Sequence, residues 1–208
     1  MVSPMNQFDA KAVTWDQDPL KVERALSVGQ AIADAIPLAG QRILEYGCGT
    51  GLLGFALQAQ AAHVTMADTS EGMLEILRQK IEMAGAVNLS AVRLDLLADP
   101  LPAGPFGVIC SLMTLHHIPD TNGILRAFHR VLAPGGWVAL SDLDVEDGSF
   151  HGPEVADVHL GFDRQRLGRQ LAEAGFRAIR FTTPYRIQRP SEGLIRQFPL
   201  FLAVAQKG

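Results

Sequence analysis

Hydrophobic residues follow two different spacings along this chain. Short apolar runs have the length of buried strands, and between them lie longer segments in which apolar residues recur every three or four positions, as on one face of a helix. We predict strands over 42–46, 63–67, 89–94, 106–112 and 137–141, with helices over 52–61, 70–84 and 121–132 between them. An earlier helix is predicted to begin at Asp18-Pro19 and to extend to Pro37, because proline is favoured at the first helical position.

This alternation predicts an α/β fold in which a parallel sheet carries helices on both faces, the Rossmann-like doubly wound architecture. The end of the chain follows another pattern. A helix over 163–175 precedes two strand-like runs, 176–183 and 198–206, and the link of about fourteen residues between these runs has no helical pattern. Strands joined without a helical crossover pair antiparallel. We therefore predict a seven-stranded sheet in the order 3-2-1-4-5-7-6, with the last strand antiparallel between its neighbours.

The length and composition suit one folded domain. The chain has 208 residues, of which 48% are hydrophobic and 19% charged, a balance that favours a folded globule over a disordered chain. We divide the single domain 1–208 into four parts. Residues 1–37 form an N-terminal cap and helix, 38–142 a cofactor-binding core, 143–162 a lid loop, and 163–208 a C-terminal helix and strand pair.

Charge and cysteine content exclude several classes of protein. The formal net charge is -4 without a Lys/Arg cluster, so the chain lacks the electrostatic footprint of a nucleic-acid-binding protein. Two cysteines, Cys48 and Cys110, cannot build a disulfide framework, and no zinc-type spacing predicts a metal site. The N-terminus lacks the features of a signal peptide, and the apolar stretch 198–205 is too short to cross a bilayer. We expect a cytoplasmic protein that binds neither membrane nor nucleic acid.

A glycine-rich turn follows the first predicted strand. Glycines stand at alternate positions in Gly47-Cys48-Gly49-Thr50-Gly51, where they allow positive φ and leave no side chain between the backbone and a ligand. The second strand ends at Asp68, where a carboxylate is able to accept both hydroxyls of a ribose. Gly49-x-Gly51-x-x-Gly54 with Asp68 also satisfies the dinucleotide fingerprint, so these residues alone leave a nicotinamide cofactor open.

Five segments in a fixed order carry a resemblance to a known family. They are Glu45-x-Gly47-x-Gly49-x-Gly51, Asp68-Thr69-Ser70-x-x-Met73, Asp95-Leu96, Phe106-Gly107-Val108-Ile109-Cys110-Ser111 and Leu132-x-Pro134-Gly135-Gly136. Over roughly residues 40–180 the chain resembles the class I S-adenosylmethionine-dependent methyltransferases, particularly the small-molecule branch (methyltransferase type 11/12-like) near the quinone-biosynthesis enzymes. One departure is Gly107, where the family usually has an acidic residue.

The resemblance implies S-adenosyl-L-methionine as the cofactor and S-adenosyl-L-homocysteine as its product. At the adenosine end, Asp68, in a motif with Thr69, would bind the ribose hydroxyls. Asp95 would accept from the adenine amino group, the Leu96 N–H would donate to the ring, and Met73 would contact it. Two structural interpretations stay open, because Met73 also fits a core position and Asp95 also fits a local cap of the residues that follow it.

At the methionine end, the resemblance assigns the ammonium group to Glu45 and to the carbonyl near Ser111. The loop formed by Gly47, Cys48 and Gly49 would lie against the methionine and ribose of the cofactor. Trp15 belongs to a segment that folds over the cofactor in similar enzymes. Glu45 has support of its own, since a carboxylate inside an apolar strand is costly without a partner.

Three histidines are the candidate catalytic residues. His117 follows the fourth strand, while His151 and His159 lie in the long acidic segment 143–162 after the fifth strand. Loops of that length are usually functional, and histidine has a pKa near neutral pH, so we expect this segment to close over the acceptor with one imidazole beside the methyl group. His116 is interpreted as a packed residue, and a metal site from His151 and His159 is not expected.

Three function classes remain after this reasoning. The leading one is in-line methyl transfer from S-adenosylmethionine to a small-molecule acceptor. The alternatives are an NAD(P)-dependent oxidoreductase and a non-catalytic protein that binds S-adenosylmethionine. The sequence leaves the acceptor and the oligomeric state open.

Overall fold

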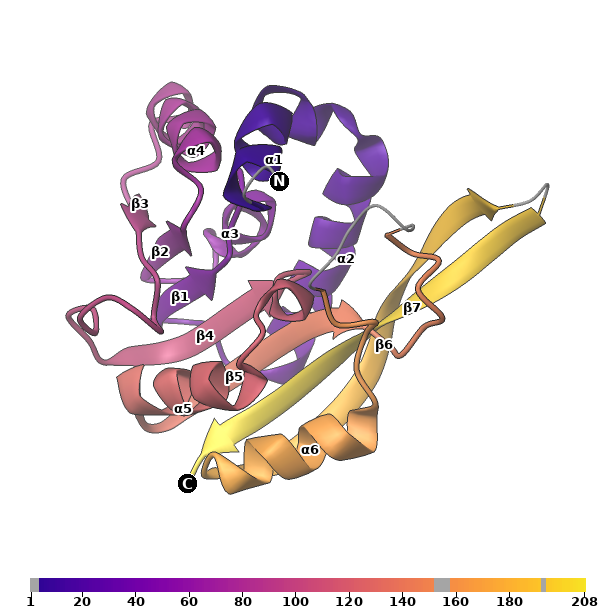
Figure 1. The fold of residues 1–208 in the computed structure, drawn as a ribbon. Coiled ribbons are helices and arrows are strands. Elements are labelled where there is room, and N and C mark those ends of the chain that lie inside the picture. Colours follow the sequence, from indigo (N-terminus) through magenta and orange to yellow (C-terminus); the bar gives the residue numbers. More distant parts are fainter. Residues whose placement is uncertain (1–3, 152–157, 192–193) are drawn as a thin grey trace.

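The computed structural model describes residues 4–151, 158–191 and 194–208, and its centre is one seven-stranded sheet (Figure 1). The strand order is β3-β2-β1-β4-β5-β7-β6. The strands are β1 Arg42–Tyr46, β2 His63–Asp68, β3 Leu89–Arg93, β4 Phe106–Leu112, β5 Leu132–Leu143, β6 Phe176–Ser191 and β7 Leu194–Lys207. Strands β1 to β5 pair in parallel, and β7 pairs antiparallel with both β5 and β6. The predicted order and the antiparallel last strand are confirmed.

Helices cover both faces of the sheet. Helices α2 (Pro19–Ala35), α3 (Leu52–Leu57) and α4 (Glu71–Ala84) pack on one face, and α5 (Thr121–Val131) and α6 (Arg164–Glu173) pack on the other. The helix starts follow from capping side chains. Asp18, Ser70 and Asp163 each accept a hydrogen bond from a backbone N–H in the first turn of α2, α4 and α6 respectively. The predicted start at Asp18-Pro19 is confirmed.

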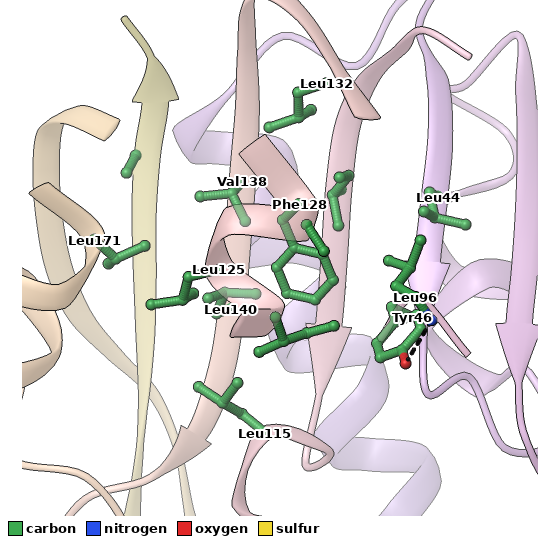
Figure 2. Close-up of a cluster of buried hydrophobic side chains, with 14 of the residues drawn as sticks. Leu44, Tyr46, Leu96, Leu115, Leu125, Phe128, Leu132, Val138, Leu140 and Leu171 are labelled. Atoms are coloured by element: carbon green, nitrogen blue, oxygen red, sulfur yellow. Dashed lines mark hydrogen bonds between the residues drawn. The ribbon is translucent and has the colours of Figure 1, made fainter. Parts of the chain in front are cut away.

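Each face carries its own apolar core. Figure 2 shows Phe128 of α5 beside Leu125, Val138 and Leu140, part of the cluster between the sheet and the α5–α6 layer. The opposite cluster joins side chains of α2, α3 and α4 to the other face of the same strands. Central strands covered on both sides are apolar on both sides, so a charged group buried there is an exception that calls for a function.

The N-terminal segment forms two short helices before α2. They are α1 (Pro4–Lys11) and the 3₁₀ helix η1 (Ala12–Gln17), and both contact α4. Asp9 fastens α1 to the start of α4, because its Oδ1 accepts from the Ser70 hydroxyl at 2.5 Å and from the Gly72 N–H at 3.0 Å. The segment therefore lies over the carboxyl edge of β1 and β2, where the glycine loop begins.

Two predicted boundaries differ from the structure. The predicted helix 52–61 ends at Leu57, because the Asn88 side chain donates to the carbonyls of Gln58 and Ala61 at 2.9 and 3.4 Å and satisfies them without another helical turn. The predicted strand 137–141 extends over Leu132–Leu143, since β7 pairs along its second half up to Leu143.

The predicted link between the last two strands is wrong. Its residues continue the strands, so that β6 and β7 form one long hairpin whose pairing runs from Tyr185 opposite Leu200 to Ser191 opposite Leu194. Prolines in the link suggested a loop, but Pro184 falls at a shift in register and β6 is an edge strand. Proline is tolerated at both kinds of position, because few ladder hydrogen bonds are lost there.

The expected lid segment 143–162 is described at its two ends, and residues 152–157 lie outside the described part. The ends run side by side, since the Val145 N–H donates to Phe162 O at 3.2 Å and the Glu146 N–H donates to Leu160 O at 3.0 Å. Both ends of the segment are thus anchored where β5 leaves the sheet. Among the described residues, no helix has the length and apolar character needed to span a bilayer.

Candidate functional site

The glycine loop and the turn after β4 form one wall of the candidate site. Gly47 has a φ of +70°, and a Cβ there would overlap the side chain of Thr114. The Thr114 hydroxyl donates to Gly47 O at 3.0 Å and also lies 3.2 Å from Leu112 O. Met113, whose φ is also positive at 56°, turns the chain so that Thr114 reaches the loop. Thr114 was not identified from the sequence, because no motif marks the residue that meets the loop from β4.

Glu45 carries an unpaired carboxylate into this wall. Its side chain is 2% exposed, and its Oε2 has no hydrogen-bond partner in the described part of the chain. Burial raises the pKa of Glu45 to about 8, against smaller opposing effects of the Gly54 N–H and the Lys80 ammonium. A Cβ on Gly54 would lie 2.6 Å from this oxygen, so the glycine makes room for the carboxylate. A carboxylate buried in this way fits a cationic group of a ligand.

Asp68 at the end of β2 holds the opposite side of the loop. Its Oδ2 accepts from the Gly49 N–H at 2.7 Å and its Oδ1 from the Ser70 N–H at 2.9 Å. Burial raises the pKa of Asp68, while these hydrogen bonds oppose the rise. The carboxylate therefore orders the loop and still has lone pairs for ribose hydroxyls. Met73 is 2% exposed, and its sulfur lies 3.9 Å from where a Cβ on Gly49 would stand, so it packs in the core beside the loop.

The Leu96 N–H, which was expected to bind adenine, has a hydrogen-bond acceptor within the chain that was not predicted. The Leu96 N–H donates to the Tyr46 hydroxyl at 3.3 Å (Figure 2), and Tyr46 packs edge-on against Phe128 with ring centroids 5.5 Å apart. Burial raises the pKa of Tyr46 to about 12. Asp95 accepts from the Leu97 N–H at 2.9 Å, which confirms the local cap as one of its roles. A backbone N–H expected to bind adenine thus already has an intramolecular acceptor.

The N-terminal segment covers the glycine loop with Trp15. The indole Nε1 lies 4.0 Å from where a Cβ on Gly49 would stand, and the Lys21 ammonium lies 3.9 Å from the centroid of the indole ring. Asp16 secures the contact. It accepts from the Thr50 hydroxyl and from the Lys80 ammonium, both at 2.5 Å, and Lys80 also donates to Thr50 O at 2.8 Å. This Asp16–Thr50–Lys80 clamp joins η1, the loop and α4.

Ser111 and the cysteines have packing roles. The Ser111 hydroxyl donates to Tyr46 O at 2.8 Å, which ties β4 to β1 just before the loop. Cys48 and Cys110 are buried, and burial raises the pKa of each thiol well above its ordinary value. Both therefore remain protonated thiols, which confirms their interpretation as small packed residues. Thr69 is partly buried between Asp68 and the helix cap Ser70.

A buried histidine–aspartate pair lies where β4 and β5 end. His116 is 1% exposed, and its Nδ1 lies 2.7 Å from Oδ1 of Asp142, which is fully buried. The Asp142 carboxylate also accepts from the backbone N–H groups of His116 at 3.1 Å and Leu143 at 2.7 Å. A carboxylate that accepts only N–H donors holds the Nδ1 proton and leaves Nε2 as the acceptor of the ring. His116 is packed, as interpreted from the sequence, but its pairing with Asp142 was not predicted, because that partner lies 26 positions away on another strand.

His117 and His151 surround His116. Their ring centroids lie 4.0 Å and 4.9 Å from that of His116, and 5.6 Å from each other. Burial is the largest cause that lowers the pKa of His117 to about 3 and that of His151 to about 4, and the neighbouring His116 contributes to both values. Both imidazoles are therefore neutral at pH 7. Phe8 of α1 packs edge-on against His117 at 5.1 Å, so the N-terminal segment extends from the glycine loop to this imidazole cluster.

The third predicted candidate, His159, lies outside this cluster. Its ring Nε2 is 3.0 Å from the carbonyl of Ile118 and 3.3 Å from the Thr121 hydroxyl. Its backbone N–H donates to His116 O at 2.8 Å. These contacts fasten the returning end of segment 143–162 to the start of α5. Among the described residues, no group of three or more His, Cys, Asp or Glu side chains is arranged to hold a metal ion.

Comparison with known proteins gives concordant matches. A family described as "Methyltransferase domain" matches residues 43–136. The chain is 35% identical over 144 residues to the ubiquinone biosynthesis O-methyltransferase of Pseudomonas aeruginosa (strain UCBPP-PA14), and the match covers 66% of this chain and 61% of that protein. It therefore spans less than two thirds of the length of this relative.

Solved structures agree in fold at low sequence identity. A chain of the Haloferax volcanii complex between the Trm112 methyltransferase activator and a putative methyltransferase superposes with a TM-score of 0.75 at 17% identity, over 96% of both chains. Phosphoethanolamine N-methyltransferase 2 of Haemonchus contortus in complex with S-adenosyl-L-methionine gives a TM-score of 0.71 at 16% identity, over 86% of this chain and 52% of that one.

Proposed function

Since the chain belongs to the class I S-adenosylmethionine-dependent methyltransferases, we propose that it transfers the methyl group of S-adenosylmethionine to a phenolic oxygen of a small molecule. The bound cofactor supplies a methyl group on a sulfonium, with a neutral thioether as the leaving group. The protein then has to hold the cofactor, accept the phenolic proton and keep water out.

The walls of the glycine loop hold the cofactor in this proposal. Glu45 receives the methionine ammonium, since its Oε2 is buried and has no hydrogen-bond partner in the described part of the chain. Asp68 receives the ribose hydroxyls, and Asp95 and the Leu96 N–H receive adenine once Tyr46 shares or releases that N–H. Trp15 and the Asp16–Thr50–Lys80 clamp close over the loop from the other side.

The His116–Asp142 pair is the observation that carries the proposal. A base oriented by a carboxylate is the arrangement that activates hydroxyl nucleophiles in unrelated enzymes. His116 Nε2 would accept the phenolic proton, while the cofactor, when bound, would supply the methyl group to the phenolic oxygen. Asp142 stabilises the imidazolium that forms, because its carboxylate contacts Nδ1 at 2.7 Å. The products are the methyl ether and a thioether, with one proton on His116.

A phenol suits this base better than an alcohol. The phenol of tyrosine has a pKa of about 10, whereas the pKa of water is about 16. General-base catalysis is most efficient when the pKa of the group that loses the proton is close to that of the base. The named relatives are O-methyltransferases, which favours oxygen over nitrogen or carbon. His117 and His151 are neutral, so they surround the base without competing for its counter-ion.

Asp142→Asn tests the mechanism. The change keeps the shape of the side chain but removes the charge that holds the Nδ1 proton and stabilises the imidazolium. We expect kcat with a phenolic acceptor to fall by about 10²–10⁴-fold. The affinity for S-adenosylmethionine, measured by calorimetry, should not change, because the cofactor contacts lie on β1, β2 and the loop after β3.

Asp144→Asn is the matched control. This neighbouring carboxylate binds Arg164 at 2.6 and 2.7 Å and does not contact the imidazoles. Its kcat should stay within about twofold of the wild type. Equal losses in the two variants, or full activity in Asp142→Asn, would contradict the role of the pair. A protein that binds S-adenosylmethionine but methylates no phenol in a panel would be a non-catalytic binder, and one stabilised by NAD(P) alone would be an oxidoreductase.

A further inference from the structure

Two arginines lie on neighbouring elements. Arg24 lies on α2 and Arg189 lies on β6, and these elements pack against one another, as the hydrogen bond from Arg180 of β6 to Ala35 O of α2 also shows. The guanidinium of Arg24 feels the Coulomb field of Arg189 and of Asp142, and His151 feels that of Arg189. Both cations therefore act electrostatically on the candidate site.

Arg24 is a partly buried cation without a carboxylate partner among the described residues. Its Nε is buried and has no hydrogen-bond partner, and no described carboxylate lies within 4.0 Å of its guanidinium. Burial lowers the pKa of Arg24, and Arg189 lowers it further, although Tyr185 and Asp18 oppose this. Arg164 and Arg196, by contrast, pair with Asp144 and Asp147. A buried N–H donor left unpaired is costly, so the Nε–H of Arg24 calls for an acceptor on a ligand.

Arg189 connects this charge to the imidazoles. Its guanidinium lies flat over Phe150, 3.9 Å from the ring centroid, and Nη1 donates to Phe150 O. Phe150 packs against His151 at 4.8 Å, and His151 packs against His116 at 4.9 Å. The chain of contacts therefore runs from Arg189 to the base, and the other donors of this guanidinium have no carboxylate partner among the described residues.

We propose that the methyl acceptor carries an anionic oxygen group, a carboxylate or a phosphate, and that Arg24 and Arg189 bind it while the phenolic hydroxyl faces His116. The two guanidiniums supply planar donors suited to such groups, from two sides. This inference rests on the proposed function, because it deepens the acceptor class of the same site. The anion fixes the acceptor by one end, so the hydroxyl at the other end is held against the base.

Calorimetry on protein saturated with S-adenosylhomocysteine measures the affinity for charged and neutral acceptor-like probes without turnover. The probes are 4-hydroxybenzoate, 4-hydroxyphenyl phosphate and the uncharged 4-hydroxybenzamide. We expect an anionic probe to bind about tenfold or more tightly than the amide, the ratio expected for charged hydrogen bonds. The anionic probe that binds more tightly shows whether the site prefers a carboxylate or a phosphate. Equal affinity for the anionic probes and the amide would overturn the proposal.

Arg24→Met and Arg189→Met identify the groups responsible. Each should remove most of the preference for the anionic probe and leave the affinity for 4-hydroxybenzamide unchanged. Arg196→Met is the matched control on the same hairpin, since that guanidinium pairs with Asp147, and it should keep the preference. Loss of affinity for charged and neutral probes alike would mean that the arginines only shape the site. If Arg24→Met does not fold, Arg189→Met and the wild-type preference still decide the question.

Two outcomes separate this inference from the proposed function. A protein that binds S-adenosylhomocysteine and methylates phenols but shows no charge preference refutes only the anionic acceptor. Failure to bind S-adenosylhomocysteine refutes the proposed function itself.

Glu154 and Asp157 lie outside the described residues and are tested by the variant Glu154→Gln/Asp157→Asn. If the wild type shows no preference and this variant acquires one, the counter-charge is internal and the proposal is wrong.

Discussion

Glu45 shows how a single buried group controls the chemistry of a ligand site. The sequence placed a carboxylate inside an apolar strand, and the structure surrounds it so completely that its pKa rises to about 8. The free protein therefore holds Glu45 largely protonated at pH 7. A cationic group bound beside Oε2 favours the carboxylate and lowers this pKa.

We expect S-adenosylmethionine binding at pH 7 to release up to about one proton from Glu45. Binding strengthens as pH rises toward 8 and then levels off, because the cofactor binds the ionised form of Glu45. Calorimetry in buffers of different ionisation enthalpy measures the released proton. Glu45→Gln should bind more weakly and release none. A proton count near zero for the wild type would place the ammonium elsewhere.

Other residues of the site were visible only in part. Asp68 was a candidate from its place at the end of β2, and the family resemblance assigned Asp95, which follows β3. Tyr46 and Thr114 were missed, since their roles depend on contacts with segments 50 and 67 positions away. The sequence favoured His151 and His159, because they lie in the long segment after β5, and it did not reveal that His116 pairs with Asp142.

Elements fasten one another around the glycine loop. Helix η1 is short and has no capping hydrogen bond from a side chain at its N-terminus. The Asp16–Thr50–Lys80 clamp joins it to the loop and to α4. The clamp lies beside Trp15 and has to yield, at least in part, for the cofactor to enter and leave. Its strength should therefore set the rate of release.

Lys80→Met should open this clamp. Because two hydrogen bonds from a charged group are lost, we expect the dissociation rate of S-adenosylmethionine to rise about tenfold and amide exchange over 12–17 to quicken. Stopped-flow fluorescence and hydrogen exchange measure the two effects. Arg78→Met is the control on the same helix, since its pair with Glu71 is exposed. If both variants behave alike, the clamp has no special role.

At the scale of the whole molecule, the imidazole cluster makes the fold sensitive to acid. His117 and His151 have folded pKa values of about 3 and about 4, well below the ordinary 6.5. As pH falls below 6.5, the unfolded chain takes up protons that the folded chain refuses, so stability is lost toward pH 4. Glu45 acts in the opposite direction, since its raised pKa lowers stability as pH rises from about 4.5 to about 8.

We expect the midpoint of urea unfolding to fall as pH is lowered from 6.5 to 4.5. The double variant His117→Gln/His151→Gln should lose much of this dependence, whereas His63→Gln should keep it, since His63 binds Ser90 far from the cluster. Unchanged acid sensitivity in the double variant would show that the imidazoles are not desolvated as described.

The sequence by itself determined the sheet order and the helix starts, because these rest on local periodicity and on capping residues. It also predicted the cofactor carboxylates Glu45, Asp68 and Asp95, in part through the family resemblance. It did not determine the length of the β6–β7 hairpin, where edge-strand pairing accommodates prolines that locally predict a loop. Nor did it join His116 to Asp142, or bring α2 with Arg24 against β6 with Arg189. These arrangements exist only because β4 pairs with β5 and α2 packs on β6.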